Sequence, residues 1–464
     1  MRDINLPGAY LIDWLVIHVL GSGALAERLY DIALSFVSIL AMLYLCPRKL
    51  RFAGFFAGIM FFLIHARDGP VQMGQRDWSM AVLILVAYCA CFRTMRSGIS
   101  GYYFLTGVLL GCATTVKPIA IIFALPILAE QCVSALRQGR RATIPCLQLA
   151  SGMAVPSALC VLWLLHERAL TAFFSSGVAM MQYHASLQRL PLGLLISRSI
   201  APLLLPLVFG AFLLPFVWQS LCRREAILLC GGVLAGFLCY VIQGKGYAYQ
   251  RYPFLVFLLL VLGLTFDEAL TRKKQWQRWL GILSLCLACI GLAGRAAKKA
   301  LDYQVKDDEF GQLLRADIED IGGAHLDGNI QCLDNFSGCI RVLYDLRLHQ
   351  STNTLYDEFL FGPSTDRAVE SSRVAFVKEL ATRSPDVFII TPQDYSKGQD
   401  TYSKIDEWPL FAKYLSDNYQ LCVERTPTVP QLWEGSPRVP LGYRVYVRRP
   451  VRCSLRGDAA QGHS

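Results

Sequence analysis

Charged residues are scarce in this sequence. Asp, Glu, Lys and Arg make up 17% of the 464 residues, and 54% are hydrophobic, whereas a typical soluble domain has about 25% charged residues. The deficit lies before residue 297, where long Leu, Val, Ile, Phe and Ala runs mostly lack the polar stripe of a surface helix. This pattern disfavours a soluble all-helical protein. It predicts a multi-span membrane domain at 1–297, followed by a soluble domain at 298–464.

Motifs for several other chemistries are missing too. The sequence has no metal-ligand spacing of Cys and His, no aromatic-basic motif for nucleic acid and no internal repeat. Many of the sixteen cysteines lie in apolar runs, where buried thiols act as small hydrophobes. In the tail, Cys332 and Cys339 can pair if their compartment is oxidising. We therefore expect no metal, no cofactor and no nucleic acid partner.

Ten apolar runs are candidate membrane spans, because a spanning helix needs roughly 17–25 apolar residues. They lie near 29–46, 52–66, 78–92, 99–116, 119–136, 143–165, 198–219, 225–243, 253–268 and 279–296. A further stretch at 8–20 is too short for a comfortable span and fits an interfacial helix better.

The net charge of +10 lies mainly in loops between these runs. Five Lys/Arg clusters, at 48–51, 93–96, 137–141, 223–224 and 272–278, fall in every other loop. The positive-inside rule places these loops in the cytoplasm, so the intervening loops and the tail lie outside. Counting back puts residue 28 outside, which predicts that an upstream first span is missing.

The outer loops hold one acid and several cations close to helix ends. Asp77 and Arg76 open one helix, Lys117 precedes Pro118 at a tight hairpin, and "GKGYAYQRY" fills 244–252. Structural alternatives are an N-cap role for Asp77, snorkelling of Lys117 to the headgroups, and an interfacial belt of Tyr and basic groups at 244–252. Trp78 fits an interfacial anchor. Convergence of these charges on one side favours a functional site.

Four segments in order resemble the motifs of polytopic GT-C glycosyltransferases, closest to the bacterial branch that includes protein mannosyltransferases and the aminoarabinose transferase of lipid A. They are "NLPGAYLIDWLVIHVLGSGALAERLYD" at 5–31, "GQRDW" at 74–78, "GVLLGCATTVKPIAIIFALP" at 107–126 and "QGKGYAYQRYPFLVF" at 243–257. The last segment has Gln250 where the family usually has His. The resemblance implies a GT-C-like bundle of about ten spans with a C-terminal extracytoplasmic α/β domain.

The resemblance also implies a reaction. In this family a sugar carried on a polyprenyl phosphate passes to a glycan, lipid or protein acceptor outside the membrane. Asp77 would take the acceptor's proton, with Arg76 orienting it or contacting phosphate, and cations would stabilise charge on the departing phosphate. The implied substrate-binding residues are Asp3, Asn5, Gln75, Lys117, Lys245, Tyr249 and Arg251.

One departure from the family pattern keeps alternatives open. The family's first catalytic acid would precede residue 1, and Asp3 matches only a secondary position near Pro7. A truncated fragment or an inactive membrane scaffold is therefore one rival reading. A lipid-linked sugar transporter or flippase is another, although transporters commonly show internal repeats. We expect a multi-pass protein of the bacterial inner membrane, with membrane lipids around it and the tail in the periplasm.

The tail reads as a small α/β domain. Strands are expected at "NIQCL", "DVFII", "YQLCVERT" and "GYRVYVRR", and helices at "SSRVAFVKELATRSP" and "FAKYLSDNY". Asp334 follows the first strand, where a loop-capping role is favoured over a site. The outer segment 166–197 fits an amphipathic surface helix, acting as a lid, a lipid gate or a plain connector.

Overall fold

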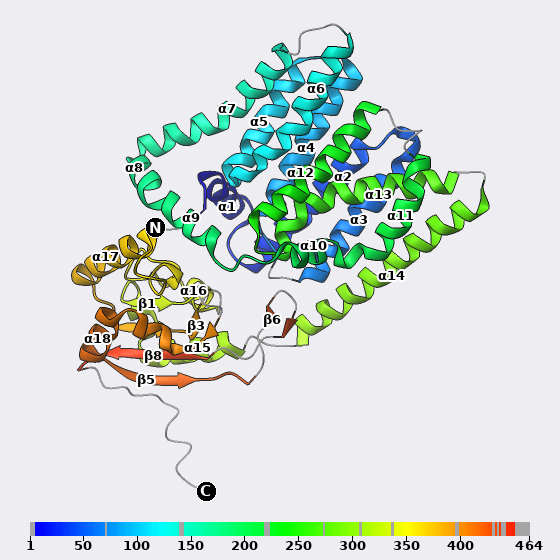
Figure 1. The fold of residues 1–464 in the computed structure, drawn as a ribbon. Helices are drawn as coiled ribbons and strands as arrows, with labels where there is room; N and C mark the ends of the chain where they lie inside the picture. Colours follow the sequence, from blue (N-terminus) through cyan, green and yellow to red (C-terminus); the bar gives the residue numbers. More distant parts are fainter. Residues whose placement is uncertain are drawn as a thin grey trace. The chain divides into compact units, whose positions relative to one another are not determined.

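The computed structural model describes residues 5–69, 72–138, 143–217, 223–271, 274–305, 309–335, 338–394, 399–428, 432–433, 436–437 and 442–450. The chain forms two compact units (Figure 1). The first, here called the helical unit, comprises Asn5–Arg168 and Arg189–Asp302. The second, the mixed unit, contains Ala169–Gln188 and the chain from Tyr303 onwards. Asp3 lies outside the described residues.

The helical unit is built from helices joined by short connections. Its helices are α1 (Pro7–Leu20), α2 (Ala24–Leu45), α3 (Arg51–Asp68), α4 (Arg76–Ser97), α5 (Gly101–Val116), the 3-10 helix η3 (Pro118–Phe123), α6 (Ala124–Gln138), α7 (Thr143–His166), α10 (Leu192–Ile200), α11 (Leu204–Val217), α12 (Arg223–Gln243), η6 (Ala248–Arg251), α13 (Tyr252–Thr271) and α14 (Gln275–Val305). Short 3-10 turns, η1 (Arg48–Leu50) and η5 (Ala201–Leu203), precede α3 and α11.

Eight helices of the described chain are long and apolar enough to cross a membrane. They cover eight of the ten expected runs. The other two runs are shorter in the structure: α5 has 16 residues, and the run at 198–219 is divided among α10, η5 and α11. Because these helices are apolar over a membrane-spanning length, the chain is a multi-pass membrane protein.

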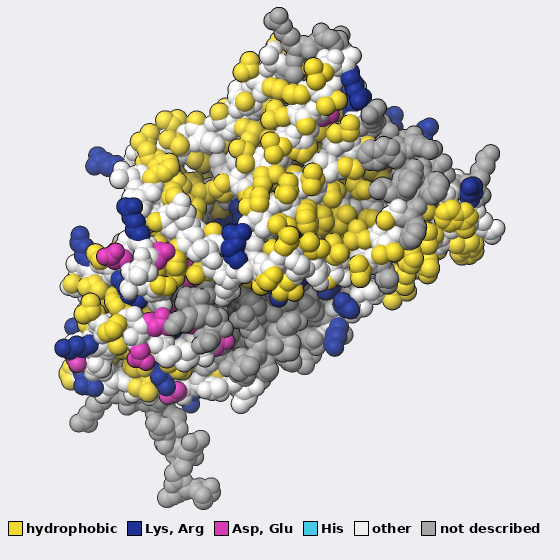
Figure 2. Space-filling model, viewed as in Figure 1, with side chains coloured by type: hydrophobic (Ala, Val, Ile, Leu, Met, Phe, Trp, Pro, Cys, Tyr) yellow, Lys and Arg dark blue, Asp and Glu magenta, His cyan; other side chains and the backbone are white. Residues whose placement is uncertain are grey.

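Apolar side chains cover both the centre and the outside of the helical unit. Helix α13 is buried along nearly its whole length, as expected for a helix that is apolar all round. The outer helices instead expose large apolar side chains, including Leu147 and Leu159 on α7 and Trp279 and Ile290 on α14. Figure 2 shows hydrophobic side chains over the visible face of this unit. Such a surface suits a lipid environment.

Glycine allows helices α5 and α7 to pack at backbone distance. A Cβ atom on Gly107 would lie 2.2 Å from the carbonyl oxygen of Leu149, and one on Gly152 would lie 2.2 Å from that of Phe104. Small residues at such contacts are typical of helix pairs in membranes, where close van der Waals packing drives association.

One end of the helical unit gathers the loops that carry basic clusters. Arg96 donates to Glu225 at 2.9 Å and to the carbonyl oxygens of Tyr44 and Leu45 at 2.8 and 3.2 Å. These contacts bring the chain near 46, 96 and 225 together, so three of the five clusters lie at a common end. This is the grouping that the alternating charge pattern predicts.

The mixed unit contains a four-stranded sheet in the order β1-β2-β8-β5. The strands are β1 (Ile330–Leu333), β2 (Val387–Ile390), β5 (Tyr419–Arg425) and β8 (Tyr443–Arg448); the first two pair in parallel, and β8 runs antiparallel to both neighbours. Small two-stranded pairs are formed by β3 (Gln393–Asp394) with β4 (Gln399–Asp400) and by β6 (Leu432–Trp433) with β7 (Ser436–Pro437).

Helices cover both faces of this sheet. Apolar residues of α15 (Glu309–Ile321) and α16 (Cys339–Asp345) pack against one face, and those of α17 (Arg367–Thr382) and α18 (Pro409–Asn418) against the other. The remaining elements are α8 (Leu170–Ala172), the π-helical turn η4 (Phe173–Gly177), α9 (Val178–Ser186), η7 (Gly323–Leu326), η8 (Asp357–Phe359) and η9 (Tyr402–Glu407). The four expected strands and two expected helices of the tail are confirmed.

One further expectation for this unit is met and a second is met in part. Cys332 and Cys339 form a disulfide that ties the end of β1 to the start of α16. The segment at 166–197 is largely helical, as expected, but is divided among α8, η4, α9 and the start of α10. Its Tyr183 ring lies 5.9 Å from Phe359 of η8, and a place on the membrane surface stays a prediction. Its role as lid, gate or connector remains a prediction.

Candidate functional site

Asp77 lies in the first turn of α4 and is completely buried. Both of its carboxylate oxygens accept hydrogen bonds from Lys117 Nζ at 2.9 Å. The N-cap of α4 is Gln75, and Asp77 does not cap the helix. The N-cap alternative for Asp77 is therefore wrong. The carboxylate pairs with the Lys117 ammonium, at the end of a neighbouring helix, and does not bond to the backbone of α4.

Lys117 occupies the break between α5 and η3. Its backbone is extended there (φ −151°, ψ 120°), which is the conformation favoured before proline. Its Nζ also donates to Gln243 Oε1 at 2.5 Å and lies 6.0 Å from the centre of the Tyr249 ring. With 16% of the side chain exposed, Lys117 points inward. The snorkelling alternative is wrong.

Arg251 forms a second buried ion pair at the same end of the helices. Its Nη2 donates to both oxygens of Asp68 at 2.7 and 2.8 Å, and its Nη1 donates to the Arg198 carbonyl at 3.0 Å. Lys245, in the same loop, is also buried. A belt of Tyr and basic groups lying in the interface would keep these heads in water, so this burial contradicts the belt alternative for 244–252.

Loop 244–251 links these groups, and we call the set of Asp68, Asp77, Lys117, Gln243 and this loop the rim. Glycines let the loop turn beside Lys245: Gly244 and Gly246 have φ of 72° and 71°, a region that other residues rarely adopt. The loop is fastened to the chain before α10 by a hydrogen bond from Leu190 N to the Gly244 carbonyl at 2.7 Å. The structure thus brings together Asp77, Lys117 and Tyr249 as the sequence predicted.

The remaining predicted residues are placed less directly. Arg76 is the first residue of α4 and lies close enough to Lys117 to interact with its charge. Gln75 precedes it and is half-buried. Asn5 lies just before α1, whose Gly8 touches the end of α5: a Cβ there would lie 2.4 Å from Thr115 Oγ1.

Sequence reasoning missed a polar chain beside this site. His65 on α3 makes two hydrogen bonds: its Nε2 bonds to Asp31 Oδ2 and its Nδ1 bonds to the Tyr252 hydroxyl, each at 2.9 Å. Asp31 Oδ1 accepts from Gly74 N at 2.9 Å, so it holds the turn that leads into α4. Trp78 is fully buried against His65, with ring centres 3.9 Å apart. The interfacial-anchor reading of Trp78 is therefore wrong.

Two further residues that sequence reasoning missed share a position that the sequence does show. Asp68 and Gln243 are the last residues of α3 and α12, and each is followed directly by a loop that was expected to lie outside. A polar side chain at the loop end of an apolar helix was thus the available signal. Asp31 and His65 lie inside helices, and only their tertiary pairing identifies them.

The rim combines charge with burial. Two carboxylates, Asp68 and Asp77, face two cations in a low-polarity setting, where electrostatic interactions are stronger than in water. Asp77 is the counter-ion of Lys117. In the part of the chain that the structure describes, no group of three or more His, Cys, Asp or Glu side chains is arranged to hold a metal ion.

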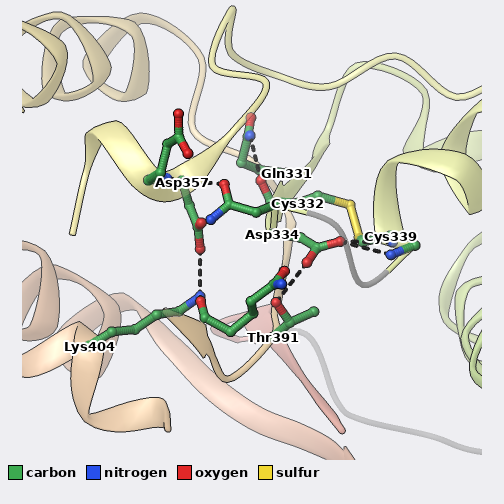
Figure 3. Close-up of polar contacts among 11 residues, drawn as sticks. Gln331, Cys332, Asp334, Cys339, Asp357, Thr391 and Lys404 are labelled. Carbon is green, nitrogen blue, oxygen red and sulfur yellow. Dashed lines mark hydrogen bonds and ion pairs between the residues drawn. A yellow bond between two sulfur atoms is a disulfide. The ribbon is translucent and has the colours of Figure 1, made fainter. Parts of the chain in front are cut away.

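A second polar cluster lies within the mixed unit, at the ends of β1 and β2 (Figure 3). Asp334 accepts from Gly338 N and Cys339 N at 3.1 and 3.0 Å and from Thr391 Oγ1 at 2.8 Å. These bonds confirm that Asp334 caps a loop and the start of α16. Beside it, Lys404 Nζ donates to Asp357 Oδ2 at 2.5 Å and to the Gln393 carbonyl at 2.8 Å. Both charges of this pair are buried, which indicates a structural role.

Comparison with solved structures identifies the fold. No protein-family model and no curated protein matches the sequence. ArnT from Cupriavidus metallidurans in the apo state superposes with a TM-score of 0.58 at 12% identity, over 95% of this chain and 87% of that one. The structure of the same protein bound to undecaprenyl phosphate superposes with a TM-score of 0.56 at 13% identity, over the same shares of both chains.

An archaeal structure has the same architecture. The Archaeoglobus fulgidus oligosaccharyltransferase, tethered to an acceptor peptide containing the NVT sequon, gives a TM-score of 0.54 at 11% identity, over 97% of this chain and 80% of that one. The chain therefore has the GT-C fold that the sequence resemblance predicted. Identities this low establish the fold alone.

Proposed function

We propose that this protein is a membrane glycosyltransferase that moves a sugar, a hexose or a pentose, from a polyprenyl-phosphate carrier to an acceptor outside the cytoplasm. The observation that carries the proposal is the buried Asp77–Lys117 pair at the rim of a helical bundle with the GT-C fold. An acid and a cation held together at the ends of neighbouring helices are what transfer from a lipid phosphate needs.

In the proposed reaction, Asp77 and Lys117 exchange partners. The donor phosphate competes with Asp77 for Lys117 Nζ, and the freed carboxylate then takes a proton from the acceptor hydroxyl or amine. The acceptor atom bonds to the anomeric carbon as the bond from that carbon to the phosphate oxygen breaks. The phosphate leaves on its lipid with the bonding electrons, stabilised by the lysine ammonium.

The other rim residues take supporting roles in this proposal. Because Asp68 offsets the charge of Arg251, we assign Arg251 to holding loop 244–251 in place. Lys245 and Arg76 then supply additional positive charge for the phosphate. The Tyr249 ring lies beside the Lys117 ammonium. Gln75, Asn5 and Asp3 are proposed to contact the sugar or the acceptor.

The carrier and the compartment belong to the same proposal. The ArnT structure from Cupriavidus metallidurans holds undecaprenyl phosphate, and the Archaeoglobus fulgidus oligosaccharyltransferase is tethered to an acceptor peptide. A rim at the membrane boundary lets one protein keep a prenyl tail in lipid and a sugar in water. We place the enzyme in a bacterial inner membrane, with a soluble domain from residue 298 in the periplasm and a lipid, glycan or protein of the cell envelope as acceptor.

A transfer assay tests this function. Purified protein in lipid nanodiscs would be given a panel of radiolabelled polyprenyl-phosphate sugars and an envelope extract as acceptor. We expect transfer by the wild type, a loss of roughly 10²–10⁴-fold in Asp77→Asn, and full activity in Asp320→Asn, which changes an exposed acid on α15. Normal transfer by a well-folded Asp77→Asn would remove Asp77 from the mechanism.

A further inference from the structure

The mixed unit contains a groove that lies apart from the rim. It is bounded by η9 and α18 and by the neighbouring strands β5 and β8, and has a volume of about 560 Å³; Figure 1 shows α18 beside these strands. The volume falls within the roughly 300–1,000 Å³ of small-molecule sites. We call it the α18 groove.

The floor of the α18 groove is aromatic and cationic. The Arg444 guanidinium lies 3.9 Å from the centre of the Tyr402 ring and pairs with Glu424 at 2.9 Å. Tyr446, on the same strand as Arg444, also lines the groove. The Tyr402 hydroxyl and Arg444 Nε are buried, and neither has a hydrogen-bond partner among the described residues. Because neither atom is exposed in the groove, neither is offered to a ligand there.

The walls mix hydrogen-bonding groups with an apolar contact. Ser403 and Ser416 are exposed along one side. Leu421 of β5 lies on the other side with 47% of its surface exposed. Hydroxyl groups can both donate and accept, so the groove offers both kinds of partner beside an apolar surface.

The charge balance narrows the class of ligand. Glu424 offsets Arg444, and Asp406 lines the groove along with Arg449, so the lining is close to neutral. A polyanion such as a nucleic acid or a phosphate chain would need an excess of cations. A ligand with many hydroxyls and an apolar ring face fits better.

We propose that the α18 groove binds a short oligosaccharide, one sugar ring lying against Tyr446 and its cross-strand neighbour Leu421, with its hydroxyls bonded to the serine side. Binding is a property of the mixed unit itself. Its use in docking a glycan acceptor rests on the proposed transferase function.

Binding can be measured without any sugar transfer. Full-length protein in nanodiscs would be titrated with maltotriose and with trigalacturonic acid, and saturation-transfer NMR would report contact. Because the lining is close to neutral, we expect the neutral maltotriose to bind and the trianionic trigalacturonic acid to bind more weakly. Ser416→Tyr, which fills the groove from its exposed edge, should weaken binding at least tenfold, and Leu421→Ala roughly fivefold.

A matched control separates blocking from misfolding. Ser371 is an exposed serine of α17 outside the groove, and its Oγ donates to the carbonyl three residues earlier, as that of Ser416 does. Ser371→Tyr should bind like the wild type. Asp77→Asn should also bind normally, which distinguishes this site from the rim.

Two results would overturn the proposal. One is the absence of maltotriose binding, including the case in which only trigalacturonic acid binds or in which an extended seven-residue Thr/Val peptide binds at the β5 edge instead. The other is saccharide binding that is equal in Ser416→Tyr, Leu421→Ala and wild type, which would place the ligand elsewhere.

Discussion

At the residue scale, the buried pair makes Asp77 and Lys117 depend on each other. Removing one partner leaves the other charge buried and alone, so we expect Lys117→Met to destabilise the protein by roughly 3–5 kcal/mol. The double variant Asp77→Asn/Lys117→Met should recover most of the lost stability, because no unpaired charge is left buried. Thermal unfolding in detergent micelles measures the stability of both variants. Arg315→Met, which breaks an exposed pair with Asp345, is the control and should cost less than about 1 kcal/mol. A double variant as unstable as the single one would contradict the pairing.

The buried pair in the mixed unit predicts a pH dependence. Burial raises the pKa of Asp357 to about 6, although the Lys404 ammonium acts in the opposite direction. In the unfolded chain the Asp357 carboxyl has its ordinary pKa of about 3.9. Between these two values only the folded state keeps the proton on Asp357. The stability that this proton contributes is complete below about pH 4 and is lost as the pH rises through about 6, a change of up to about 3 kcal/mol.

Hydrogen exchange at β2 amides, followed from pH 4 to pH 7, measures this slope once intrinsic exchange rates are divided out. Asp357→Asn should flatten it, because the amide does not titrate. Asp386→Asn in the loop before β2 is the control and should leave the slope in place. Equal slopes in wild type and Asp357→Asn would contradict the assignment.

At the scale of elements, the contact between α5 and α7 should tolerate no side chain at its glycines. Gly152→Ala would place a methyl group 2.2 Å from the Phe104 carbonyl oxygen and should force the helices apart, at roughly 1–3 kcal/mol. Gly291→Ala on α14, where a Cβ meets nothing within 4 Å, should be neutral or slightly stabilising. The midpoint of heat denaturation in detergent separates the two. Similar midpoints for both variants would show that this contact is loose.

The elements themselves were largely predictable. Apolar runs and alternating strands are local patterns, so the long helices and the strands β1, β2, β5 and β8 follow from the sequence. Breaks were less predictable: the division of 198–219 among three helical pieces depends on packing as well as on Pro202 and Pro206. The segment Ala169–Gln188 is compact with the tail, which no local pattern signals, because it depends on contacts distant in sequence such as His184 with Glu358.

At the scale of the whole molecule, the site was partly predictable for the same reason. Charge alternation placed Asp77, Lys117 and loop 244–252 on one side, and the structure brings them together at one rim. Their partners were not predictable: Asp68 and Gln243 complete ion pairs and hydrogen bonds with residues more than a hundred positions away. The sequence locates polar groups at helix ends, but only the packed bundle decides which groups meet.

The disulfide offers a test of compartment. If the mixed unit lies outside the cytoplasm, Cys332 and Cys339 should be oxidised in cells, whereas Cys132 and Cys289, which are free, should react with alkylating reagents after denaturation. Mass spectrometry of alkylated peptides from membranes prepared under acid quench reads out both. Fully alkylated Cys332 and Cys339 would place the unit in a reducing compartment.

The most direct test of the account is the side of the membrane on which the rim opens. Tyr247→Cys, on the rim loop, and Ser97→Cys, at the end that carries basic loops, would be treated in intact cells with a membrane-impermeant thiol reagent, each compared with the parent protein. The account predicts labelling above the parent level for Tyr247→Cys at once, and for Ser97→Cys only after permeabilisation. The reverse pattern would contradict transfer to an acceptor outside the cytoplasm.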